Sequence, residues 1–397
     1  MLGREAHLAT VFGWLDYSEA HRRQMLDAVS LFKDRDTRDE LGIGPIRDTL
    51  SDLLFPGTST IQTRAKYFLL VPWTYQEVER WLRGKRKTAA EIWNRARSIE
   101  YQLIESMRGN SRSTDGLIGR QAGRTLRRMP STIYWAGLAK WGIRRVEGFQ
   151  EQYHKALAVY GAPTSLDRRR KASESEEWHD ARSNWHLGIP RVPDDFPTSA
   201  FLELTQSEAE YLRNRIIESH PNSLLAFLIR KGCGVDGGVR FPWEHPSAGD
   251  LPPDLSDQLD HARILSEVIH GALLLYNLLL SEKLRDQTAR TEHGTRFIGK
   301  YNESIEIWAD RLLSNSNWEG LQIDDFWSLI DRTGARIPVL TRRFVNDWVR
   351  IVRDKQPKTM ARDPEARQRV GNQERLAKPG RARLDNPTAL EQWGGSS

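Results

Sequence analysis

The chain has 397 residues, 39% of them hydrophobic and 28% charged, which is ordinary for a soluble globular protein and long enough for two or three domains with buried cores. Lys and Arg number 59 against 53 Asp and Glu, so the formal net charge is +6. The single cysteine, Cys233, excludes an intramolecular disulfide and a cysteine-based zinc cluster.

The first half of the chain predicts a series of helices. Apolar residues recur at helical spacing over 18–33, 44–55, 75–82 and 89–107. Alternating apolar and polar patterns, which would indicate strands, are rare. We therefore predict an all-α fold with at most a few short strands, and a basic helical N-terminal domain over 1–163.

One stretch of this domain is strongly basic. Between Arg108 and Arg145, nine Lys or Arg accompany one acid, Asp115, so the stretch has a net charge of +8. At about 100° per residue, a helix over 115–129 would separate basic from apolar side chains. The basic face would hold Arg120, Arg124, Arg127 and Arg128, and the apolar face Ile118, Ala122, Leu126 and Met129.

A second helix is predicted over 132–141, so the two could form a helix-turn-helix motif. However, the second helix carries only Lys140 as a cation, which is few for an element that reads bases. We therefore predict a phosphate-binding platform made by the first helix together with Arg144 and Arg145. The alternative is a solvated basic face that binds nothing.

A second basic segment runs from Arg80 to Arg97, where seven cations accompany Glu91 and the net charge is +6. Its candidate phosphate contacts are Arg83, Lys85, Arg86 and Lys87. Because the two segments together hold +14, the rest of the chain carries −8. This asymmetry predicts an oriented electrostatic surface.

Aromatic residues lie among these cations and could stack on unpaired bases. They are Trp81, Trp93, Tyr134, Trp135 and Trp141. At helical spacing a Trp more often belongs to the core, so we expect most of these rings to be buried.

The second half predicts a linker or long loop over 164–199, where a charge run is followed by several prolines, and a helical C-terminal domain over 200–352. Its first helix begins with a capping box at Thr205. Helices are predicted over 206–219, 223–230, 256–286, 296–314, 324–331 and 339–352. The apolar run 268–280 is too short to span a bilayer and predicts a core helix. Residues 353–397 are polar, contain four prolines and predict a flexible tail that orders on a partner.

No motif identifies a reaction. The chain has no P-loop, nucleophile elbow or zinc-protease helix. Two Glu-x-x-His pairs, Glu151 with His154 and Glu267 with His270, resemble di-iron ligand spacing, but ten histidines produce such pairs by chance. We therefore predict no catalytic residue, cofactor or metal, and keep a metal-dependent enzyme as the least favoured alternative. Residues 1–10 lack the apolar core of a signal peptide, so we expect a cytoplasmic protein without membrane contact.

Four segments carry a resemblance to a known family. They read FGWLDYSE at 12–19, RDELGIG at 38–44, FPGTSTIQTRA at 55–65 and STIYWAGL at 131–138. They resemble signatures of an uncharacterised bacterial domain-of-unknown-function family, over about residues 11–393. The family has no assigned activity or catalytic residue. The resemblance implies an association with anti-phage defence islands, where such proteins accompany helicases and phospholipase-D-like nucleases.

These observations predict a non-enzymatic accessory component of a bacterial defence or nucleic-acid-processing assembly. It would contact DNA or RNA without sequence specificity, beside a helicase or nuclease subunit. The candidate phosphate-binding residues are Arg83, Lys85, Arg86, Lys87, Arg120, Arg124, Arg127, Arg128, Arg144 and Arg145. The alternative is a protein-interaction adaptor whose basic face meets an acidic partner.

Overall fold

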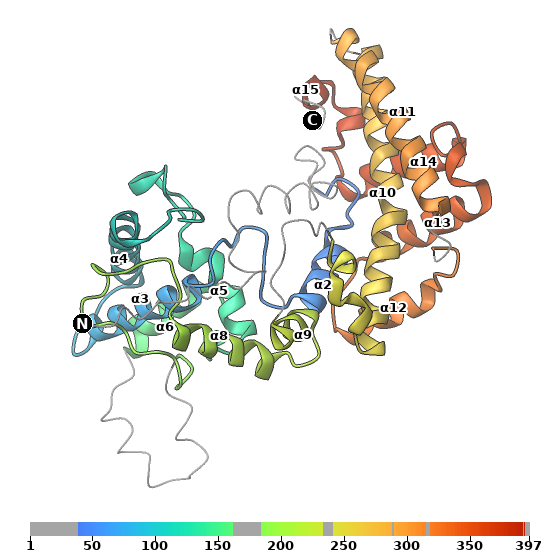
Figure 1. The fold of residues 1–397 in the computed structure, drawn as a ribbon. Coiled ribbons are helices and arrows are strands. Elements are labelled where there is room, and N and C mark those ends of the chain that lie inside the picture. Colours follow the sequence, from blue (N-terminus) through green and yellow to red (C-terminus); the bar gives the residue numbers. More distant parts are fainter. Residues whose placement is uncertain are drawn as a thin grey trace. The chain divides into compact units, whose positions relative to one another are not determined.

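The computed structural model describes residues 39–161, 184–232, 241–287, 290–314, 318–391 and 393 (Figure 1). Within these ranges every regular element is a helix, and β-type pairing is limited to one antiparallel bridge between Arg144 and Trp185. The predicted all-α fold is therefore confirmed. The helix predicted over 18–33, the FGWLDYSE segment and Cys233 lie outside the described residues.

The chain divides into two compact units. Among the described residues, unit 1 contains 55–161 and 184–232, and unit 2 contains 39–54, 241–287, 290–314, 318–391 and 393. These boundaries differ from those expected at 163, 199 and 352. The physical reason is that tertiary contacts override chain order: Leu212 and Ile216 belong to the core of unit 1, whereas the helix over 44–54 contacts helices of unit 2.

The helices of unit 1 are α3 (Tyr67–Leu82), α4 (Ala89–Asn110), α5 (Pro130–Lys140), α6 (Gln150–Tyr160), α8 (Gln206–Ser219) and α9 (Leu224–Lys231), with the short 3-10 helix η1 (Gly123–Thr125). Most residues of α3 are buried, as expected for a central helix, and it contacts both α4 and α5. It begins at Tyr67 and continues through Pro72, so it is longer than the helix predicted over 75–82. α4 also contacts α6.

A buried ion pair joins α3 to α8. The Lys66 ammonium lies 2.6 Å from Glu208 Oε2, and the two side chains are only 2% and 9% exposed. Burial lowers the pKa of Lys66, while the charge of Glu208 acts in the opposite direction. Glu208 also completes the capping box with Thr205, which confirms the helix start predicted there. This pair fixes residues 206–219 within unit 1.

The helices of unit 2 are α2 (Gly44–Leu54), α10 (Pro253–Gln287), α11 (Thr291–Ser314), α12 (Ile323–Arg332), α13 (Val339–Lys355), α14 (Pro364–Ala377) and α15 (Pro387–Glu391). The described residues of unit 2 also include the 3-10 helices η3 (Pro242–Glu244), η4 (Pro246–Asp250), η6 (Pro357–Thr359) and η7 (Arg383–Asp385). α10 is the central helix, which contacts α2, α11, α13, α14 and α15.

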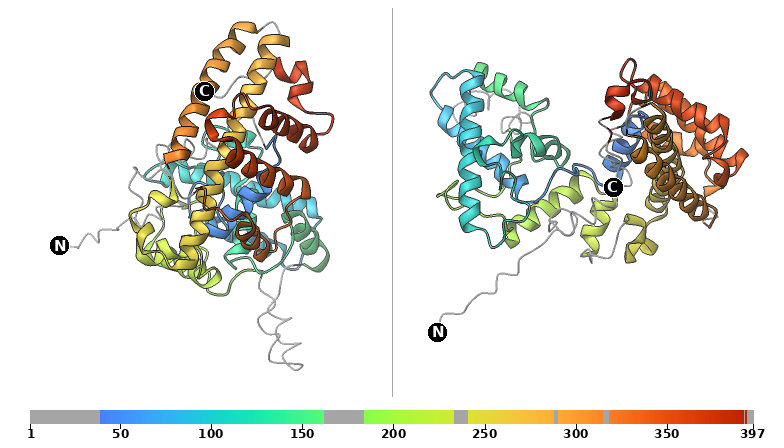
Figure 2. Two further views of the ribbon diagram at one scale, coloured as in Figure 1. Left: turned by 90° about the vertical axis from the view of Figure 1, so that its right-hand side faces the viewer. Right: turned by 90° about the horizontal axis from the view of Figure 1, so that it is seen from above.

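α10 and α11 form an antiparallel pair (Figure 2). Gly271 faces the ring of Trp308, and Gly294 faces the backbone of Arg285, so a side chain at either glycine would clash. α10 is long and apolar enough to cross a membrane by length and composition, which is weak evidence, and 61% of its most apolar stretch is buried. That burial fits the core helix predicted over 268–280.

The prediction of a flexible tail over 353–397 is wrong for the described residues of this segment, because they are helical and packed. They continue α13 to Lys355 and then build α14 and α15. Val370 is fully buried, and Trp393 is 1% exposed with its ring 5.4 Å from that of Phe297. The apolar residues of the segment are too widely spaced to show helical periodicity, but α10 and α11 supply the surface that buries them.

Candidate nucleic-acid interface

The arginine-rich segment 115–129 does not form the predicted helix. It consists of turns and η1, because Gly116, Gly119 and Gly123 adopt φ values of 76°, 84° and 49°, at which a right-handed helix cannot continue. A side chain at Gly119 would lie 2.8 Å from Ile104 of α4. The segment is therefore a loop that approaches α4 closely, and we call it the arginine loop.

Two arginines of α4 hold the arginine loop along that helix. Arg108 donates hydrogen bonds to the carbonyl oxygens of Arg120 and, at 3.4 Å, Gly119. Arg97 donates to the carbonyl oxygen of Leu126 at 3.2 Å. The loop thus runs antiparallel to α4, with its later residues beside the first half of the helix.

The arginine loop separates its cations from its apolar residues even without a helix. Leu117 and Met129 are buried in unit 1. Arg124, Arg127 and Arg128 are exposed, and none of the three forms a hydrogen bond or ion pair with any residue that the structure describes. Three guanidinium groups that have no partner in the described part of the chain therefore lie within a stretch of five residues.

Arg120 is half-buried, and its guanidinium lies 3.7 Å from the carboxylate of Asp115. It is therefore less available to an external anion than the three arginines that follow it.

Arg144 is a core residue, which corrects its prediction as a phosphate contact. It is 7% exposed, its guanidinium lies 4.7 Å from the Trp135 ring centroid, and its Nε donates to the Trp135 carbonyl oxygen at 3.3 Å. Burial lowers the pKa of Arg144. The sequence could not reveal this because Trp135 comes within reach only through the turn after α5. Arg145 is exposed, and its backbone N–H donates to the Asn184 carbonyl oxygen.

The second set of predicted cations occupies the loop between α3 and α4. Arg83, Lys85 and Arg86 are exposed. Lys87 is half-buried, and its ammonium lies 2.7 Å from the carboxylate of Glu91. Hydrogen bonds from Lys87 and Thr88 lower the pKa of Glu91 to about 2. This loop leads directly into the capping box that begins α4.

α4 therefore brings together two basic segments that are about 40 residues apart in the sequence. We call this surface the basic band. It consists of Arg83, Lys85, Arg86, Lys87, Arg97, Arg124, Arg127 and Arg128. The nine helical steps from Thr88 to Arg97 span about 14 Å along the helix axis. The band lies wholly within unit 1, along one helix and the two loops that contact it.

The aromatic residues of the basic segments divide as expected. Tyr134, Trp135 and Trp141 are buried in the core of unit 1, and Trp81 packs against that core. The expectation that most of these rings are core residues is therefore confirmed. Trp93 differs, since it lies on the outer side of α4 and is 42% exposed.

A buried hydrogen-bond network fixes the end of the arginine loop. The Glu100 carboxylate accepts hydrogen bonds from the backbone N–H and the hydroxyl of Ser131, at 2.7 and 3.0 Å. Gln150 Nε2 donates to the Ser131 hydroxyl and to the Tyr75 hydroxyl, which contacts His154 Nε2 at 2.8 Å. Burial raises the pKa of Glu100 to about 7 and lowers that of His154 to about 4. The network anchors Ser131, the second residue of α5, which follows Met129 by two residues.

The Glu-x-x-His pairs do not form ligand sets in the structure. His154 is engaged by Tyr75, whereas Glu151 is exposed and pairs with Lys155. Glu267 pairs with Arg263. Among the residues that the structure describes, no group of three or more His, Cys, Asp or Glu side chains could hold a metal ion.

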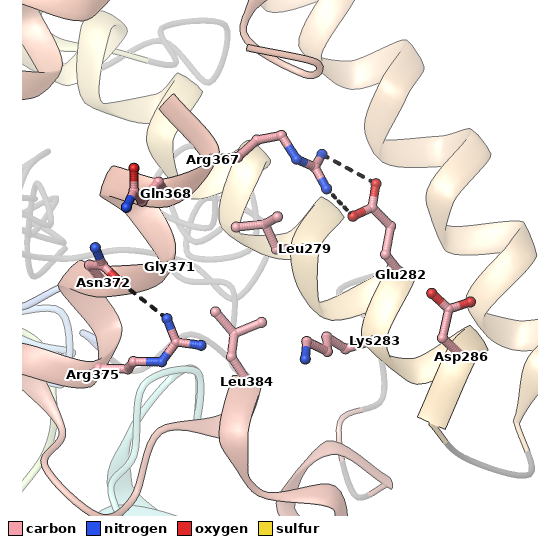
Figure 3. A pocket seen from close by; sticks show the side chains of 10 residues that line it. All are labelled: Leu279, Glu282, Lys283, Asp286, Arg367, Gln368, Gly371, Asn372, Arg375 and Leu384. Carbon is pink, nitrogen blue, oxygen red and sulfur yellow. Dashed lines mark hydrogen bonds and ion pairs between the residues drawn. The ribbon is translucent and has the colours of Figure 1, made fainter. Parts of the chain in front are cut away.

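Unit 2 contains a polar pocket of about 260 Å³ between α10 and α14 (Figure 3). Within its lining Arg367 pairs with Glu282, while Arg375 pairs with Asp385, the residue after Leu384 of the lining. Pairing leaves these guanidinium groups with little to offer a ligand. The basic band is therefore the stronger candidate for a functional site.

The chain was compared with family models, curated proteins and solved structures. The model of a family of unknown function, DUF6361, matches residues 9–397. No curated protein and no solved structure matches the chain.

Proposed function

The chain belongs to the family DUF6361, whose function is unknown, and we propose that it binds nucleic acid by contacting phosphates through the basic band of unit 1. The observation that carries this proposal is that Arg124, Arg127 and Arg128 are exposed and have no partner among the described residues, on a loop that hydrogen bonds hold against α4. Guanidinium groups present planar, forked donors that suit phosphate oxygens.

The hydrogen bonds that hold the arginine loop against α4 strengthen the argument. A mobile loop could separate its cations and relieve their mutual repulsion. Here Arg97 and Arg108 bind the loop carbonyl oxygens, and Glu100 binds Ser131 just after the loop. An anion that meets several of these cations at once would offset the repulsion, and a phosphate backbone supplies such repeated charge.

Phosphate contacts carry no information on sequence, so we propose binding to DNA or RNA without sequence specificity. In this proposal the protein is a non-enzymatic, cytoplasmic component of a bacterial defence or nucleic-acid-processing assembly, and a helicase or nuclease subunit supplies the chemistry. The setting is the one that the family resemblance implies, through its association with anti-phage defence islands.

The test measures the affinity of the full chain for fluorescently labelled strands and duplexes by anisotropy at low salt. The band variant carries Arg124→Ala, Arg127→Ala and Arg128→Ala. A matched control in unit 2 carries Arg332→Ala, Arg336→Ala and Arg343→Ala, which removes the same charge from exposed arginines that likewise have no partner among the described residues.

We expect the band variant to lose most of its affinity and the control to keep it. Equal losses in the two variants would mean that net charge alone drives binding. No binding by the unmodified protein would refute the proposal and favour an adaptor that meets an acidic protein.

A further inference from the structure

Trp93 is the residue of this surface that phosphate binding does not explain. Tryptophan is highly buried on average, yet Trp93 is 42% exposed and does not belong to the apolar core of unit 1. Its helix neighbours Ile92 and Ala96 do belong to that core. The ring is therefore presented to solvent by a helix that is firmly packed on its other side.

One side of the Trp93 ring is supported by a fixed cation. The Arg97 guanidinium carbon lies 4.9 Å from the centroid of the Trp93 ring. Arg97 is itself held by hydrogen bonds to the Tyr101 hydroxyl at 2.8 Å and to the Leu126 carbonyl oxygen. This support orders the ring without covering it, because almost half of the residue's surface stays exposed.

Cations flank the ring in both directions along α4. Trp93 follows Thr88 by five residues, about 8 Å along the helix axis, and Arg86 and Lys87 lie just before Thr88. In the other direction Arg97 contacts Leu126, the neighbour of Arg127. An aromatic platform between cations is the arrangement by which proteins bind unpaired bases and the phosphates on either side.

We propose that the basic band binds single-stranded nucleic acid, with an unpaired base stacked on the free face of Trp93. A duplex cannot use this platform, because its base faces are already stacked on their neighbours. The inference rests on the proposed function, since it assumes that the band meets nucleic acid, and it adds the strandedness of the ligand.

The experiment compares three probes of equal length: a single strand, a duplex, and a strand whose sugars carry no bases. The protein variants are Trp93→Ala, Trp93→Phe and the control Phe149→Ala, which removes another exposed aromatic side chain of unit 1. Circular dichroism checks that each variant is folded. The abasic probe tests stacking on the unmodified protein, so the result does not depend on any variant.

We expect the unmodified protein to bind the single strand more tightly than the abasic strand and the duplex. Trp93→Ala should weaken single-strand binding by at least about fivefold, the lower value for stacking of one base on an aromatic side chain. Trp93→Phe should recover part of the loss, Phe149→Ala should have no effect, and binding of the abasic strand should be unchanged by Trp93→Ala.

Equal affinity of the unmodified protein for the single strand and the abasic strand would overturn the inference, and so would a Trp93→Ala variant that binds the single strand normally. Either result leaves phosphate binding by the band intact. Failure of the unmodified protein to bind any of the three probes would instead refute the proposed function.

Discussion

Glu100 should make the stability of unit 1 fall as the pH rises toward neutrality. Glu100 is 2% exposed, and burial raises the pKa of its carboxyl group from 4.5 to about 7, although hydrogen bonds from Ser131 and the charge of the nearby Arg97 oppose the rise. Between these two pH values the folded protein binds a proton that the unfolded chain has lost. The free energy of unfolding therefore decreases with pH over this range, by about 3 kcal/mol in total.

The variant Glu100→Gln isolates this effect. A glutamine oxygen can still accept the Ser131 N–H hydrogen bond, but the side chain cannot ionise. Burial lowers the pKa of His154 to about 4, which has the opposite consequence, since stability then rises with pH up to about 6.5. Because both proteins contain His154, the difference between them reports on Glu100.

The assay is urea-induced unfolding of both proteins at several pH values from about 4.5 to about 8. Relative to Glu100→Gln, the unmodified protein should lose about 3 kcal/mol of stability across this range, with most of the loss complete near pH 7. A difference that does not change with pH would show that folding leaves the pKa of Glu100 at its ordinary value, and would refute the reasoning.

Three further substitutions test the packing of the two units. Lys66→Met should reduce the free energy of unfolding by about 3–5 kcal/mol, because it leaves the buried Glu208 carboxylate without its counterion, and urea unfolding would measure the loss. Arg144→Ala should lower the melting temperature but leave nucleic-acid affinity unchanged, since this side chain is buried against Trp135; reduced affinity in a folded variant would contradict that placement. Trp393→Ala should reduce the free energy of unfolding by about 3–5 kcal/mol and make the segment after α13 sensitive to protease. Rapid cleavage of this segment in the unmodified protein would instead support the prediction of a flexible tail.

The helices that the sequence predicted best are those with signals inside one short segment. The bounds of α8 match the prediction of 206–219 because Thr205 and Glu208 form the capping box within four residues of each other. The signals for the start of α4 and the end of α2 are also local in the sequence. The end of α2, for example, precedes Pro56 and Gly57, which break a helix without any tertiary contact.

The errors arose where tertiary contacts or backbone geometry decide the outcome. The apolar spacing over 115–129 suited a helix, but three glycines with positive φ turn the chain and press it against α4. Their presence was a signal for turns that the helical spacing outweighed. The burial of Arg144 and the ordering of α14 depend on partners elsewhere in each unit, which periodicity cannot show.

The candidate site was predicted in part. The exposed cations at 83–86 and at 124–128 were identified from charge alone. That both segments lie along α4, and that Trp93 is exposed while the other aromatic residues are in or against the core, required the structure. A cation and an aromatic ring four residues apart on one helix, as in Trp93 and Arg97, would have been a usable signal.

The salt dependence of binding tests the central claim most directly. The logarithm of the association constant falls with the logarithm of salt concentration by about 0.7 per contacted phosphate on a single strand and about 0.9 on a duplex. If Arg124, Arg127 and Arg128 each contact one phosphate, the band variant should have a slope that is shallower by about 2 on a single strand. The control variant in unit 2 should keep the slope of the unmodified protein. A band variant with an unchanged slope would place the phosphate contacts elsewhere and contradict the account.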